Sequence, residues 1–193
     1  MEDTFTQRVT GIIIHGFAVA HAVAAAALSQ TVAGDDVVLT LLTTSMIISI
    51  TLINDRKKNV GAGLAIAGCL AGFFLGTRGA LFIVKWIPFA GNAANSITTM
   101  IVTEILGWTT YIIVKDNVNV KGMKFKDKLK YLQRGYTTQK AEKDLSEKLY
   151  NSMSSEDKDE VNQIIREMGK KDLPDSTFEL LNKRLETIIR QYA

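Results

Sequence analysis

Two ionisable residues, Arg78 and Glu104, lie inside stretches of this chain that are otherwise uncharged and apolar. Ionisable groups are costly in hydrocarbon, so they normally face a partner or water. If the two stretches form an antiparallel hairpin around Pro88, an ion pair between Arg78 and Glu104 is feasible, although a mismatch of about six residues leaves ~9 Å of helix rise to close. A structural ion pair and a role in gating or permeation are equally supported.

Hydroxyl and amide side chains form a second feature, because they recur at helical spacing. Such a row can line water or form hydrogen bonds between helices, and a Thr hydroxyl can also bond to its own preceding turn. Packing between helices is therefore the simpler interpretation, and the lining of a channel is the alternative that would imply a function. The residues are Asn92, Ser96, Thr99 and Thr103 in a later segment and Ser45 and Ser49 in an earlier one.

Small residues at every fourth position form a third feature, made of Gly68, Gly72 and Gly76 and extended by Ala80. This spacing puts one small side on a single helix face and lets another helix approach closely. The face can serve packing inside one chain or self-association in a homo-oligomer.

The elements that must hold these residues follow from the distribution of charge. The 106 residues from Val9 to Val114 carry only nine charges, whereas the 79 residues from Lys115 to Ala193 carry 31. A helix needs about 20 mostly apolar residues to cross a bilayer. The sequence therefore predicts an all-α protein with four transmembrane helices in two hairpins, near residues 10–33, 37–53, 60–84 and 90–114.

The cations in the connections support the same topology, because short cationic loops stay on the cytoplasmic side. Arg8, the group Arg56–Lys58 and the Lys-rich exit from Lys115 all fall on one side of four crossings. Both termini are then predicted to be cytoplasmic. A soluble bundle of apolar helices is the alternative, since the second segment is short and the first is rich in Ala.

The hydrophobic segments also contain an internal similarity. The run from Thr43 to Ser49 resembles the run from Ile97 to Thr103, and each run follows a turn that contains Gly. Two helical hairpins built on one plan would explain it, and chance in a biased composition is the alternative.

The polar third is predicted to be helical as well. Ser154 opens and Gly169 closes one helix, a capping box of Ser176 and Glu179 opens another, and a further helix is expected at 138–152. This third has few large apolar residues and can form only a marginal core of its own. Docking onto the bundle or oligomerisation should therefore bury its apolar side chains. The predicted organisation is a transmembrane domain at 1–115, a basic juxtamembrane segment at 116–136 and a cytosolic helical domain at 137–193.

A cluster of cations directly follows the last apolar segment. Anionic lipid attracts such clusters, at about 1 kcal/mol per cation near the surface. Lipid is the favoured partner, an anionic small-molecule signal is the alternative, and nucleic acid is not expected because the later charges are mixed in sign. The cluster consists of Lys121, Lys124, Lys126, Lys128 and Lys130.

Several short motifs together resemble a known family. They are the stretch from Ile13 to Phe17, the Gly34–Asp36 turn, the Thr-Ser-Met-Ile run, and the segments at 86–92 and 103–108. This combination is similar to an uncharacterised bacterial family of hydrophobic helical domains, which often follow Era-like GTPase domains. The resemblance covers residues 9–114 and implies a bacterial membrane protein of unknown role, in the inner membrane. The chain has no Gly-x-x-x-x-Gly-Lys-Ser/Thr loop, the motif that binds nucleotide phosphates. The resemblance therefore implies no nucleotide hydrolysis.

No arrangement of residues predicts catalysis, a metal site or a cofactor. His15 and His21 are six residues apart and so lie on different faces of a helix, which favours packing over a shared metal. We therefore expect a non-enzymatic protein. The favoured hypothesis is an oligomeric membrane effector or channel that responds to a signal or a partner. The alternative is a non-conducting anchor or scaffold for a cytosolic partner such as a GTPase.

Overall fold

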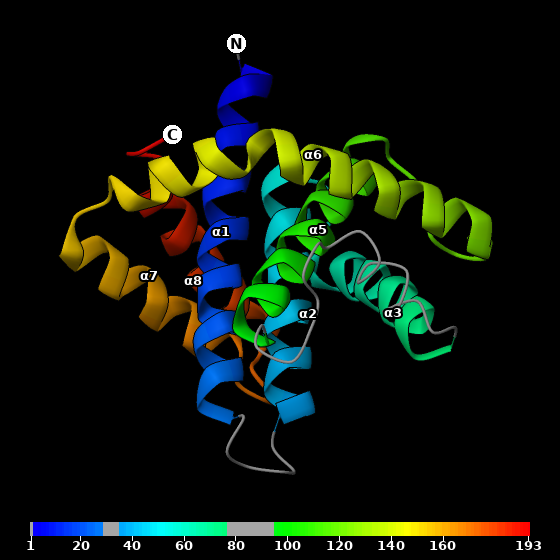
Figure 1. The fold of residues 1–193 in the computed structure, drawn as a ribbon, viewed down its shortest axis with the longest axis horizontal. Coiled ribbons are helices and arrows are strands. Elements are labelled where there is room, and N and C mark those ends of the chain that lie inside the picture. Colours follow the sequence, from blue (N-terminus) through cyan, green and yellow to red (C-terminus); the bar gives the residue numbers. More distant parts are fainter. Residues whose placement is uncertain (1, 29–34, 77–94) are drawn as a thin grey trace.

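The computed structural model describes residues 2–28, 35–76 and 95–193, and within them the regular secondary structure consists of helices, with no strand (Figure 1). The all-α prediction is confirmed for these residues. The helices are α1 (Glu2–Leu28), α2 (Asp35–Asn54), α3 (Val60–Gly76), α5 (Asn95–Lys115), α6 (Phe125–Asn151), α7 (Ser155–Met168) and α8 (Asp175–Ile189).

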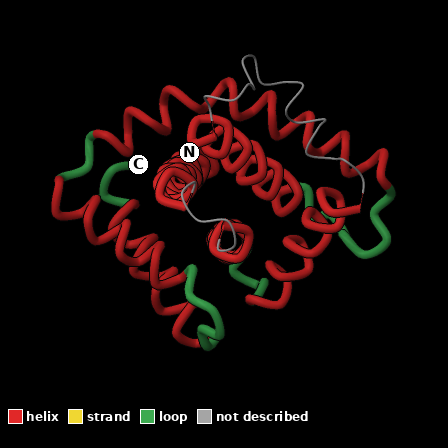
Figure 2. The backbone as a smooth tube through the Cα atoms, turned by 60° about the horizontal axis from the view of Figure 1, so that its bottom comes forward, coloured by secondary structure: helices red, strands yellow, loops and turns green. Residues whose placement is uncertain are grey.

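Helix α1 is the central element of the arrangement. It contacts α2, α5, α6, α7 and α8, whereas α3 contacts mainly α2 and the start of α6. Figure 2 shows α1 and α2 close to end-on with the other helices around them, and Figure 1 shows α6 passing across α1 and α5. The polar C-terminal helices therefore pack along the apolar ones.

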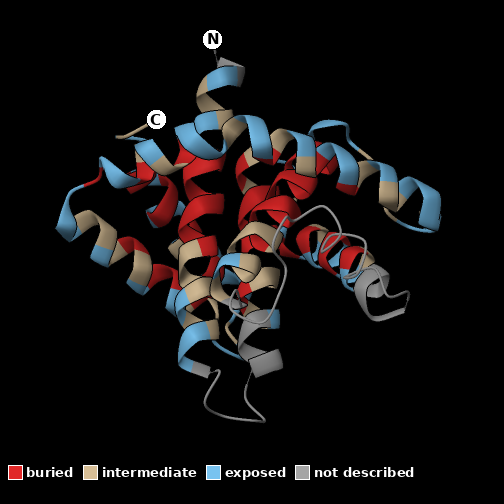
Figure 3. Cartoon of the chain, viewed as in Figure 1, coloured by how far each residue is buried: buried red, intermediate tan, exposed pale blue. Residues whose placement is uncertain are grey.

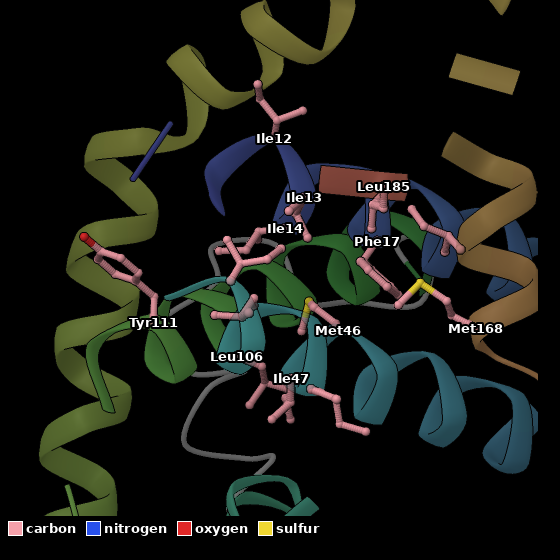
Figure 4. Close-up of a cluster of buried hydrophobic side chains, with 14 of the residues drawn as sticks. Ile12, Ile13, Ile14, Phe17, Met46, Ile47, Leu106, Tyr111, Met168 and Leu185 are labelled. Carbon is pink, nitrogen blue, oxygen red and sulfur yellow. The ribbon is translucent and has the colours of Figure 1, made fainter. Parts of the chain in front are cut away.

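One hydrophobic core joins the two parts of the chain. In Figure 4, Phe17 of α1 and Met46 of α2 lie in the same cluster as Met168 of α7 and Leu185 of α8. Leu132 of α6 is fully buried in that core as well. Docking onto the apolar helices thus supplies the burial that the short C-terminal helices lack.

Four helices coincide with the four predicted apolar segments, but a four-span membrane bundle is not confirmed. Only Thr4–Ala27 and Ser96–Lys115 are long and apolar enough to cross a membrane by length and composition. The shorter apolar helices, Thr40–Asn54 and Val60–Ala71, fall below that length among the described residues.

The predicted ends of the C-terminal helices have mixed outcomes. The boundaries of α7 are confirmed, because Ser154 Oγ accepts a hydrogen bond from the backbone N–H of Asp157 at 3.1 Å and Gly169 follows the last turn. The capping box at Ser176 is wrong, since Pro174 is the N-cap of α8 and places Ser176 inside the first turn. Helix α6 begins at Phe125, 13 residues before the expected helix at 138–152, because cationic residues such as Lys126 and Lys130 are good helix formers.

Candidate functional site: a buried polar cluster beneath helix α6

Glu104 lies at the centre of a buried polar cluster that joins three helices. Oε1 of its carboxyl group is 2.9 Å from Nδ1 of His15 on α1, and Oε2 accepts a hydrogen bond of 2.8 Å from Nε2 of Gln139 on α6. The three residues are only 3%, 2% and 4% exposed, for His15, Glu104 and Gln139. Buried polar groups need partners, and each of these meets that need only while α1, α5 and α6 stay together.

Glycines let the three helices approach closely enough to form this cluster. A Cβ atom added to Gly135 of α6 would lie 2.9 Å from the backbone oxygen of Ile105 on α5 and closer still to the Thr109 hydroxyl. A Cβ atom on Gly107 of α5 would lie 2.7 Å from the side chain of Ile14 on α1. The polar cluster and the close contacts therefore belong to one rigid junction.

Tyr150 of α6 covers the His15 side of the cluster. Its ring packs edge-on against the imidazole, with 5.3 Å between ring centroids and an angle of 62° between the planes. The Tyr150 hydroxyl donates to Oδ1 of Asn162 on α7 at 3.4 Å. Burial raises the pKa of the Tyr150 phenol above its ordinary value of 10.0.

The raised pKa of Tyr150 predicts a specific loss of stability at alkaline pH. The folded protein holds the phenol proton more tightly than the unfolded chain does. The stabilising contribution is therefore complete below pH 10 and is lost as the pH rises through the raised pKa. Urea unfolding at pH 8 and above pH 10 should show this loss in the wild type and a smaller loss in Tyr150→Phe; equal losses in the two proteins would contradict it.

Polar residues of α2 bind the C-terminal helices. Ser45 Oγ donates to the backbone oxygen of Met168 at 2.7 Å, and Ser49 Oγ donates to Oδ1 of Asn182 at 2.6 Å. Arg56, just beyond α2, forms an ion pair with the buried carboxylate of Glu186 on α8. The two serines predicted to form an intramembrane polar face are thus paired with α7 and α8 in this structure.

Two of the polar residues predicted in the later segment are joined by a hydrogen bond along their own helix. Thr103 Oγ1 donates to the backbone oxygen of Thr99 at 2.8 Å, and both Ser96 and Thr99 are half-buried. Arg78, Asn92 and Ala80 lie outside the described residues. The predicted partner of Glu104 is therefore not described, and within the described part of the chain Glu104 is bound by His15 and Gln139.

The predicted small-residue face lies on α3. Gly68 is exposed, and a Cβ atom added there would meet nothing within 4 Å in the described chain. Gly72 and Gly76 belong to the last turns of α3, where only the backbone is described. Gly68 thus makes no close helix contact within the described residues, and self-association through this face stays a prediction.

The predicted lysine cluster surrounds the start of α6. Lys121, Lys124, Lys126 and Lys130 are exposed, and Lys128 donates from Nζ to the backbone oxygen of Cys69 on α3 at 3.0 Å. These residues remain available to an anionic surface, apart from Lys128, which joins α6 to α3.

Tyr150 and Glu186 take part in the buried contacts although the sequence did not single them out. The same is true of two amides, Gln139 and Asn182. Each is a lone amide on an amphipathic helix, a pattern that usually marks a solvent-facing residue. Their position on the apolar side of the helix was the only available signal. Among the described residues, no group of three His, Cys, Asp or Glu side chains is placed to hold a metal ion.

Comparison with known proteins does not assign the chain to a group. No family model matches it, and neither a curated protein nor a solved structure matches it significantly.

Proposed function

We propose that this protein is a membrane effector with two forms. In the closed form, which is the form described above, α6, α7 and α8 cover the apolar helices. In the open form, α1 and α5 leave this cover, enter a bilayer and alter its permeability. The observation that carries the proposal is that both span-length helices are mostly buried against protein, over 61% and 67% of their apolar windows.

The covering helices have outer faces that do not suit hydrocarbon. Lys140 and Asp144 of α6, Asp159 of α7 and Lys183 of α8 are all exposed, and Figure 3 shows exposed residues along the outer side of α6 above the buried middle of α1. Charged side chains cost several kcal/mol each near the bilayer centre. The closed form is therefore expected outside the hydrocarbon, and insertion requires α6, α7 and α8 to move away.

The middle of α1 and its C-terminal end differ in how completely they are covered. Residues 9–18 are buried, whereas Val23 is 57% exposed. A groove of about 360 Å³ separates this exposed end from Arg166 and Gly169 of α7. The incompletely covered C-terminal end of α1 is where we expect separation to begin, and the Glu104 cluster at the middle of α1 is expected to break later.

The expected site of action is the bacterial inner membrane, with both termini on the cytoplasmic side. The expected trigger is a cytosolic partner or an anionic signal, and the open form is expected to be a homo-oligomer. Burial of the polar cluster supports the need for a trigger, because a stable closed form opens only in response to a specific event.

Dye release from vesicles tests the proposed function. Purified protein added to vesicles whose anionic lipid supplies the anionic signal is expected to release the dye, and alkaline carbonate should then fail to extract the protein. If the protein binds the vesicles firmly without releasing dye, the effector function fails and the alternative, a membrane anchor or scaffold, is favoured. Protein that stays in the soluble fraction would overturn a membrane role.

A further inference from the structure

Helix α3 has an apolar face that the described chain does not cover. Val60, Gly63 and Leu70 are on its buried side, and Gly63 lies against the backbone of Ile48. The opposite side follows the same helical spacing but is exposed, and Leu64 retains 49% of its accessible surface. The exposed residues are Gly61, Leu64, Ala65, Gly68 and Ala71, and none of them is charged.

The lysine-rich start of α6 lies beside this face. The hydrogen bond from Lys128 to Cys69 fixes the first turns of α6 against the middle of α3. Phe125 precedes Lys128 by three residues and so shares its side of α6, and Lys124 is the residue just before the helix. Phe125 is 43% exposed, and Figure 1 shows that α3 and this end of α6 project together from the rest of the molecule.

We propose that the exposed face of α3 and the start of α6 form a docking surface for a bilayer with anionic headgroups. An apolar face edged by lysines and an exposed aromatic ring is typical of elements that lie in the interface of a membrane. The lysines attract the headgroups, while Leu64 enters the boundary with the acyl chains. This inference rests on the proposed function and names the surface that first meets the membrane.

Charge favours a bilayer over a second copy of the chain as the occupant. A symmetric contact between two α3 faces would use the same patch on both copies. Because Lys128 is bonded to Cys69, the residue next to Gly68 of that face, the two lysine clusters would come close together and repel. An anionic bilayer instead neutralises the cluster.

Co-sedimentation with vesicles tests the docking surface in the full-length protein. We expect binding to vesicles of phosphatidylcholine with phosphatidylglycerol, and much weaker binding to phosphatidylcholine alone. The triple change Lys124→Gln, Lys126→Gln and Lys130→Gln should lower the partition coefficient about a hundredfold at low salt, at roughly fivefold per lysine. The matched triple change Lys143→Gln, Lys148→Gln and Lys183→Gln should have a much smaller effect.

A second matched pair of variants tests the apolar part of the docking surface. Leu64→Gln should weaken binding severalfold, whereas Leu180→Gln, at a more exposed leucine on α8, should not. Equal losses in the two triple variants, or in the two leucine variants, would overturn the docking surface. A dimer in solution that is lost in Leu64→Gln would also overturn bilayer docking, because the α3 face would then serve self-association.

Docking and permeabilisation can fail separately. If the protein docks through this surface without releasing dye, the docking surface stands and the effector function fails. If dye release persists unchanged in the Lys124, Lys126 and Lys130 variant, the effector function stands and the docking surface fails.

Discussion

Replacing Glu104 by alanine is expected to lower the free energy of unfolding by about 3–5 kcal/mol, the usual cost of removing one member of a buried pair. His15 and Gln139 would each lose the oxygen that they contact, at 2.9 and 2.8 Å, while remaining buried. Chemical denaturation measures the loss. Since the cluster holds the closed form, the same variant is expected to release dye from vesicles faster than the wild type.

Milder and distant changes act as controls for Glu104. Glu104→Gln retains the shape but offers one acceptor oxygen to two neighbours, so a smaller loss of about 1–3 kcal/mol is expected. Glu179→Gln, on the exposed side of α8, should change the unfolding free energy by less than ~0.5 kcal/mol. A Glu104→Ala protein as stable as the wild type would show that the cluster does not hold the helices together.

Replacing Gly135 by alanine is the second large effect that we expect. The new methyl group would meet the backbone of α5 at 2.9 Å from both the Ile105 oxygen and the Thr109 nitrogen. Backbone atoms cannot rotate away, so α6 must shift from α5. We expect a loss of about 3 kcal/mol, at the upper end of the cost of overpacking, together with faster dye release.

Gly68→Ala is the matched control for Gly135→Ala. It makes the same chemical change in another helix, but the added Cβ atom meets nothing within 4 Å. The higher helix propensity of alanine should then raise the free energy of unfolding by up to about 1 kcal/mol. Similar losses in both variants would mean that the close approach of α5 and α6 is not what makes Gly135 necessary.

Local signals in the sequence were enough to place most helices. Four apolar segments became α1, α2, α3 and α5, and the ends of α7 follow from Ser154 and Gly169. Local signals were less reliable where two of them compete. At α8, Pro174 is already favourable before a first helical turn, so the helix begins before the apparent capping box at Ser176.

The candidate site could be predicted only in part, because its contacts join distant parts of the chain. Glu104 stood out as a lone charge in an apolar helix, which correctly indicated that it needs a partner. From charge alone an ion pair with Arg78 was considered feasible, and it stays untested because Arg78 lies outside the described residues. A carboxylate also accepts from an imidazole and an amide. His15 and Gln139 are 89 and 35 residues away from Glu104, and no local pattern links them.

The central proposal is that α1 must separate from α6 before the membrane is permeabilised, and a reversible crosslink tests it most directly. A Cβ atom on Gly11 of α1 would lie 3.5 Å from Cβ of Ser146 on α6, which suits a disulfide bond. The pair Gly11→Cys and Ser146→Cys can be made together with Cys69→Ser, which removes the single native thiol. The oxidised protein is expected to release no dye from anionic vesicles, and a reducing agent should restore release. Equal release from the oxidised and reduced proteins would contradict the proposal, because α1 would then act without leaving its cover.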